Sequence, residues 1–151
     1  MGESLKPLQV YVVEDSVIIR RLLASSIEAA GAELMGESAD AAAAIAELTR
    51  LRPDLIVIDV GLKSGTGFDV LEALQELDPH PAAIKIVLTN YASPEYRRMS
   101  LRMGANGFFD KATEAAQVLA LIGALAAEKA RRCASHRREC ARKDPGSENR
   151  A

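Results

Sequence analysis

Five short apolar segments alternate along the chain with stretches of helical period, and this alternation limits the possible folds more than any other feature. The apolar segments are predicted strands, at residues 10–13, 33–38, 55–58, 84–88 and 107–109. Predicted helices follow them at residues 16–30, 40–51, 67–77 and 94–103, with a long final helix from about Thr113. Strands joined by helices in this way predict an α/β fold, with a parallel sheet covered on both faces.

The first predicted helix has a start signal, a stop signal and two distinct faces. Ser16 is a suitable N-cap, and Gly31 is a suitable stop. The residues predicted to face the core are Ile19, Leu22, Leu23, Ile27 and Ala30. Val17 is predicted to lie on the outward face with Arg20 and Arg21, where it could dock a partner or be an ordinary isolated apolar residue.

Polar side chains follow four of the five predicted strands. Glu14 and Asp15 follow the first strand, Asp59 the third, Thr89 the fourth and Lys111 the fifth. An open parallel sheet binds ligands beyond the carboxyl ends of its strands, so we expect these side chains to converge on one rim. Glu14 and Asp15 alone could merely complement the positive start of the first helix, but Asp59 has no such explanation.

This set of residue types suits the transfer of a phosphoryl group. Three carboxylates at close range repel one another unless a cation joins them. Mg²⁺ is suitable because it accepts a few carboxylates and keeps several waters and a phosphate oxygen. The metal and Lys111 would take up charge on the phosphoryl oxygens, and Thr89 would donate a hydrogen bond to them. A carboxylate can then act as the nucleophile and form an aspartyl phosphate.

Four segments at these strand ends carry a family resemblance: VYVVED, LIVIDVGLKSGTG, IVLTN and GFFDK. With them, the chain from residue 8 to about 128 resembles the receiver domain of bacterial response regulators. The resemblance implies a flavodoxin-like (βα)5 doubly wound sheet with strand order 2-1-3-4-5. It also implies a phosphoacceptor domain that catalyses only its own phosphorylation and dephosphorylation, rather than an enzyme.

The resemblance assigns the phosphorylation chemistry to named residues. Asp59 is implied to be the phosphoacceptor, and the implied donor is a phosphohistidine on a sensor kinase or a phosphotransfer protein. The implied Mg²⁺ ligands are Glu14, Asp15, Asp59 and the backbone carbonyl of Gly61. The resemblance further implies that the domain then signals through protein contacts or passes the phosphoryl group on in a relay.

The resemblance also implies a set of residues that couple phosphorylation to shape. Lys111 would pair with the phosphoryl group, Thr89 would be the switch hydroxyl, and Phe108 would be the aromatic whose rotamer follows Thr89. Ala112 departs from the family pattern, because a proline in a cis bond usually stands there. A cis bond before Ala costs ~3–4 kcal/mol, so a trans bond or a strained site is predicted.

The sequence leaves two other function classes open. A Mg²⁺-dependent phosphohydrolase with an Asp nucleophile would commonly have a second acid two residues after Asp59. Gly61 stands there instead, which favours a persistent phosphoaspartate. A DNA-binding regulator could act through the basic C-terminal segment, but the sequence has no helix-turn-helix pattern there.

The 151 residues are predicted to form one domain with short appendages. We expect an N-terminal extension at 1–7, a receiver domain at 8–128, and a basic tail at 129–151 that is partly helical and then disordered. Residues 1–128 carry 11 Lys and Arg against 18 Asp and Glu (−7), and residues 129–151 carry 8 against 3 (+5). Cys133, His136 and Cys140 share one helical face, but a zinc site there would lack a fourth ligand.

The chain has no signal-peptide pattern and no apolar stretch of the ~20 residues that a membrane helix needs. The sequence therefore predicts a stand-alone receiver domain in the cytoplasm. We expect neither nucleic acid nor a membrane as a partner.

Overall fold

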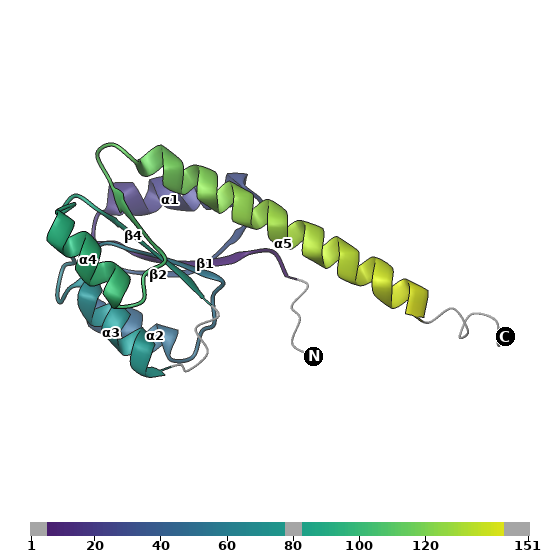
Figure 1. The fold of residues 1–151 in the computed structure, drawn as a ribbon, viewed down its shortest axis with the longest axis horizontal. Coiled ribbons are helices and arrows are strands. Elements are labelled where there is room, and N and C mark those ends of the chain that lie inside the picture. The colour runs from purple at the N-terminus through teal and green to yellow at the C-terminus, as the bar shows by residue number, and fades with distance from the viewer. Residues whose placement is uncertain (1–5, 78–82, 144–151) are drawn as a thin grey trace.

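The structure is a computed structural model that describes residues 6–77 and 83–143 (Figure 1). Its strands are β1 (Gln9–Val13), β2 (Glu33–Ser38), β3 (Leu55–Ile58), β4 (Ile84–Thr89) and β5 (Gly107–Asp110). Its helices are α1 (Val17–Ala29), α2 (Ala41–Leu48), α3 (Gly67–Leu77), α4 (Pro94–Arg102) and α5 (Ala115–Lys143). All strand pairs are parallel and the strand order is β2-β1-β3-β4-β5, which confirms the predicted fold.

Helices cover both faces of the sheet, with α1 and α5 on one face and α2, α3 and α4 on the other (Figure 1). Successive residues of a strand point to opposite faces, so each central strand contributes to two cores. Val10 and Val12 of β1 pack with α1 and α5, whereas Tyr11 and Val13 pack with the helices of the other face. Burial on both sides explains why β1 and β3 read as continuous apolar runs rather than alternating ones.

Helix α1 has the predicted caps, but one residue of its predicted core face is exposed. The Ser16 hydroxyl accepts a hydrogen bond from the Ile19 amide at 3.3 Å, and Gly31 after the helix has a φ of 81°. Leu23 and Ile27 are buried, whereas Leu22 is 52% exposed, so its assignment to the core was wrong. A helix packed on a sheet buries the side chains of only one face. In α1 that face is centred on Leu23 and Ile27, and Leu22 lies beside it.

Helix α5 is the longest element, at 29 residues, and projects well past the sheet (Figure 1). Val118, Ile122 and Ala126 pack into the core beside α1, and the Lys129 ammonium lies 2.9 Å from the Asp54 carboxylate. The predicted domain boundary at residue 128 therefore falls inside a continuous helix. The part of the predicted tail that was expected to be disordered, residues 144–151, lies outside the described residues.

Two further backbone features bear on the sequence predictions. Within residues 6–77 and 83–143 there is no cis peptide bond, so the bond before Ala112 is trans. None of the described helices combines the length and the apolar character that crossing a membrane requires.

Candidate functional site

Three acidic side chains from two loops meet at the carboxyl edge of the sheet. Carboxylate oxygens of Glu14, Asp15 and Asp59 all lie within 4.8 Å of one another. The backbone sets this arrangement, because the Glu14 amide bonds to the Ser38 carbonyl and the Asp59 amide bonds to the Val13 carbonyl, each at 2.9 Å. These bonds extend the parallel ladders by one residue, so the acids stand where β1 and β3 end. Glu14 and Asp59 are buried, and Asp15 is exposed.

Lys111, which follows β5, joins two of these acids. Its Nζ lies 2.7 Å from Oδ2 of Asp59 and 2.9 Å from Oε1 of Glu14. Its amide donates to the Thr89 carbonyl at 2.9 Å, which fixes the residue at the end of β4. Burial by itself lowers the pKa of Lys111, but the hydrogen bonds and charges of Asp59 and Glu14 outweigh it, so the pKa is raised and the side chain is an ammonium ion.

The surroundings of Glu14 in the cluster raise the pKa of its carboxyl group. Its burial raises its pKa, and the negative charge of Asp59 raises it further. The hydrogen bonds from Lys111 and from the Ser16 amide oppose this rise without cancelling it. The ionised carboxylate is therefore costly in the absence of additional positive charge.

Thr89 and Phe108 lie on neighbouring strands beside the acids. Thr89 is fully buried, and its hydroxyl oxygen accepts a hydrogen bond from the Tyr91 amide at 3.1 Å. Phe108 is turned into the core between β5 and α4. The guanidinium carbon of Arg97 on α4 lies 5.1 Å from the centre of its ring, within the range of a cation–π contact.

The loop after Asp59 is shaped by close contacts at two glycines. A Cβ on Gly67 would lie 2.4 Å from the Asp59 carbonyl oxygen, so only glycine lets α3 begin this near the strand end. A Cβ on Gly61 would lie 2.6 Å from the Tyr91 ring, which shows that the ring rests directly on Gly61. The Gly61 amide points back to Oδ1 of Asp59 at 3.3 Å.

Two residues that the sequence did not indicate belong to this site. The sequence did not predict a role for Tyr91, although this residue lies two positions after Thr89, where β4 ends. Arg20 was assigned to the outward face of α1, yet it donates to the Glu14 carbonyl at 2.8 Å and to the Glu37 carboxylate at 2.7 Å. Arg20 therefore anchors the acidic loop to β2, a contact that no local sequence pattern reveals.

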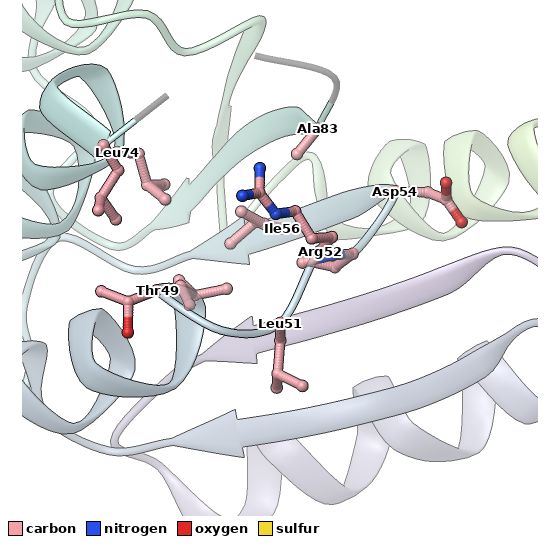
Figure 2. A pocket seen from close by; sticks show the side chains of 10 residues that line it. Thr49, Leu51, Arg52, Asp54, Ile56, Leu74 and Ala83 are labelled. Carbon is pink, nitrogen blue, oxygen red and sulfur yellow. The ribbon is translucent and has the colours of Figure 1, made fainter. Parts of the chain in front are cut away.

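A separate cavity of about 250 Å³ lies at the opposite edge of the sheet, near the starts of β3 and β4 (Figure 2). Its walls are mainly apolar and include Leu51, Ile56 and Leu74. Arg52 reaches into it, while Asp54 points away and pairs with Lys129. The described residues that line it contain no cluster of acids or nucleophiles like that of the acidic rim.

The sequence matches a known protein family, and the match includes the acidic rim. The sequence model of the response regulator receiver domain matches residues 10–123, which is most of the chain and includes every residue of the site. The chain belongs to the response regulator receiver family. Proteins of this family are phosphorylated on an aspartate and act in two-component signal transduction, so the family resemblance inferred from the four motifs is confirmed.

Several known proteins are similar to this receiver domain. A protein-glutamate methylesterase/protein-glutamine glutaminase of Xanthomonas oryzae pv. oryzae is 33% identical over 106 residues, which are 70% of this chain and 29% of that protein. An uncharacterised 14.6 kDa protein of Leptolyngbya boryana is 30% identical over 120 residues, 80% of this chain and 91% of that protein. The solved CheY-like receiver domain of Methanospirillum hungatei JF-1 has a TM-score of 0.70 and 27% identity, covering 85% of this chain and 99% of that chain.

The length of the match limits what the first relative implies. The chain spans about 29% of the methylesterase that it resembles. The similarity is therefore evidence for a shared receiver domain, and it does not assign the activity in that relative's name to this chain.

Proposed function

We propose that the protein is a phosphorylation switch in which Asp59 accepts a phosphoryl group from a phosphohistidine of a sensor kinase or phosphotransfer protein. A carboxylate oxygen of Asp59 attacks phosphorus, the N–P bond of the phosphohistidine breaks, and the imidazole leaves with the electron pair. The observation that carries the proposal is the contact of buried Asp59 with Lys111 inside a cluster of two further acids. A nucleophile held by a cation at a strand end is the arrangement that this reaction needs.

The acidic cluster is the proposed site of Mg²⁺. Glu14, Asp15 and Asp59 would contribute carboxylate oxygens, and Gly61 its backbone carbonyl. The residues fit a hard divalent ion, because three carboxylates lie within 4.8 Å of one another and the Lys111 ammonium pairs with Glu14 and Asp59, and because the pKa of Glu14 is raised by burial and by Asp59. When bound, Mg²⁺ would neutralise charge on the phosphoryl oxygens.

Lys111, Thr89 and Phe108 would couple phosphorylation to a change of shape. Lys111 would leave the Asp59 oxygen and pair with the phosphoryl group that now occupies its place. The Thr89 hydroxyl would turn from the Tyr91 amide to a phosphoryl oxygen, and the space that it vacates would admit the Phe108 ring. The signal would then be read at α4 and β5, either as a protein contact or in a further phosphoryl transfer.

Apolar side chains beside the acidic loop support a protein as phosphodonor. Val17 is 50% exposed and Ile18 is 78% exposed, and both lie in the first turn of α1, directly after the metal ligands. Together with Leu22 they form an apolar surface that a helical partner could cover while its phosphohistidine reaches Asp59. A kinase of this kind would act in the cytoplasm, where we place the protein.

The phosphoryl lifetime separates this switch from a phosphohydrolase. Gly61 offers no side-chain acid to protonate a leaving group, and the Tyr91 ring rests on Gly61 in the loop after Asp59. We therefore propose that the phosphoaspartate persists rather than turning over rapidly. Steady release of phosphate from a small phosphate ester, at far more than one equivalent of protein, would instead favour the hydrolase.

The decisive experiment combines intact-mass spectrometry with two variants. The protein is incubated with acetyl phosphate and Mg²⁺, and separately with a phosphorylated histidine kinase. We expect the mass of one phosphoryl group on the wild type and none on Asp59→Asn. Asp69→Asn is the matched control, since Asp69 is an exposed acid on α3 whose acceptor role toward the Thr66 amide an asparagine preserves. Labelling of Asp59→Asn to the wild-type level would contradict the proposal.

A further inference from the structure

The outer part of α5 leaves the body of the domain. Of the α5 side chains that the structure describes, Cys133 is the last buried one, and its sulfur lies 4.0 Å from the Lys6 carbonyl oxygen. Residues beyond it continue the helix into solvent as far as Lys143 (Figure 1). This segment also lies beyond residues 10–123, where the family match ends. Its features are therefore not explained by the phosphorylation site.

Two metal-binding side chains stand one turn apart on this projecting segment. Nε2 of His136 lies 3.6 Å from Sγ of Cys140. A tetrahedral zinc ion with Zn–S of about 2.3 Å and Zn–N of about 2.0–2.1 Å holds two such ligands about 3.5–3.6 Å apart. The pair is thus already spaced as one edge of a zinc tetrahedron.

Cys133, the third possible zinc ligand on this helical face, does not lie with His136 and Cys140. Cys133 is buried against the N-terminal segment, whereas Cys140 is exposed and His136 is half-buried. Within the described residues, the only group of three or more possible ligands is the acidic cluster at the phosphorylation site. Two ligands do not close a structural zinc site, which needs four. The described part of one chain therefore supplies half a site.

A second copy of the same segment would supply the other half. In a dimer with two-fold symmetry, each chain presents the same residues to the shared axis. We propose that His136 and Cys140 from two chains bind one Zn²⁺ in a Cys2His2 site that joins the projecting ends of α5. Each thiol would lose its proton on binding, and no oxidation or reduction takes place.

The charge of the segment makes such a dimer depend on the metal. Residues 134–143 carry four Lys or Arg against one Glu, so two such segments repel each other. Among the side chains of the segment that the structure describes, none after Cys133 is buried, so none is available to hold two helices together. A short helix without packing is marginal in water, and a shared ion would order both copies.

The test uses the full reduced chain with a phosphine reductant, in excess Mg²⁺ so that the acidic cluster is occupied. Zinc chloride is titrated in while light scattering after size exclusion reports the mass. We expect a doubling of the mass at one zinc per two chains, reversed by a chelator. Titration with Co²⁺ should give the intense visible bands of a tetrahedral ion and a sulfur-to-cobalt charge-transfer band.

Variants assign the result to the proposed pair. Cys140→Ser and His136→Ala should lose the zinc-dependent dimer and the cobalt bands. Ser135→Ala, in the same turns of α5, and Glu14→Gln, in the acidic cluster, should keep both. A monomer that binds one zinc per chain, or a dimer that forms equally in Cys140→Ser, would overturn the proposal.

Discussion

Nζ of Lys111 lies 2.7 Å from Oδ2 of Asp59, and this ion pair joins the carboxyl ends of β5 and β3. Because Glu14 shares the same ammonium group at 2.9 Å, one buried cation serves two buried carboxylates. A phosphoryl group on Asp59 would take the place of one partner and keep Lys111 paired. The contact thus gives the unphosphorylated site a defined geometry that the reaction must rearrange.

Replacing Lys111 with alanine should slow phosphorylation without abolishing it. The proposed nucleophile and the proposed metal ligands stay, but one cation that would stabilise the transferring group is lost, so we expect at least a ~10-fold slower rate. Intact-mass time courses with acetyl phosphate at saturating Mg²⁺ would measure the rate. Lys63→Ala is the control, since Lys63 is an exposed ammonium in the loop after Asp59. Equal rates for the two variants would remove Lys111 from the chemistry.

Replacing Glu14 with glutamine should stabilise the metal-free protein at neutral pH. The raised pKa means that the folded chain holds the Glu14 proton more tightly than the unfolded chain does. Stability from this group is therefore present below its ordinary pKa and declines as pH rises through the folded value. Removing the charge should therefore raise Tm at pH 7.

Thermal melts of Glu14→Gln and of the wild type test this prediction. They are recorded between pH 5 and 8 in buffer that contains a chelator. The difference from wild type should grow with pH and should reverse in saturating Mg²⁺, because the ion favours the carboxylate. Glu72→Gln on the exposed side of α3 should melt as the wild type does. A lower Tm for Glu14→Gln at pH 7 without metal would show that its ion pair with Lys111 outweighs the strain.

Removing the Tyr91 ring should shorten the life of the phosphoaspartate. The ring rests on Gly61, two residues after Asp59, so we expect it to limit the approach of water from that side. We expect Tyr91→Ala to lose its label several-fold faster after the donor is removed, whereas Tyr91→Phe should behave as the wild type because it keeps the ring. The decay of the phosphorylated mass at fixed Mg²⁺ measures both. Identical lifetimes for Tyr91→Ala and wild type would show that the ring does not shield the site.

Replacing Ser100 with alanine should stabilise the fold. Its hydroxyl is fully buried on α4 and has no hydrogen-bond partner among the described residues. Removing an unsatisfied buried polar group should add ~1 kcal/mol to the free energy of unfolding. Ser25→Ala, at an exposed position of α1, controls for the higher helix propensity of alanine. The idea fails if urea denaturation gives Ser100→Ala no gain beyond that of Ser25→Ala.

Two truncations should place the functional end of the domain. Deleting residues 134–151 removes no described buried side chain, so Tm and labelling of Asp59 should stay close to those of the full chain. Deleting residues 129–151 also removes the Lys129 ion pair with Asp54 and the buried Cys133, and should lower Tm. If the two truncated proteins have the same Tm, the folded domain ends at residue 128, as the sequence predicted.

The sequence by itself determined the sheet and the edge at which chemistry is possible. A chain in which apolar strands alternate with helices forms a parallel sheet, and parallel strands bring their carboxyl ends to one rim. Glu14, Asp59 and Lys111 each follow a strand directly and Asp15 follows Glu14, so their meeting needed no knowledge of side-chain contacts. Their roles in phosphorylation stay predictions that the labelling experiments test.

The tertiary structure alone decided which neighbour each side chain meets. The helical period places Leu22 near the core face, but the sheet and α5 cover a stripe that leaves it exposed. Arg20 is bonded to the acidic loop because β2 brings Glu37 within 2.7 Å of it. The contact of Tyr91 with Gly61 likewise joins two loops 30 residues apart. Periodicity and turn chemistry act over a few residues, whereas these contacts depend on elements that only the packed sheet brings together.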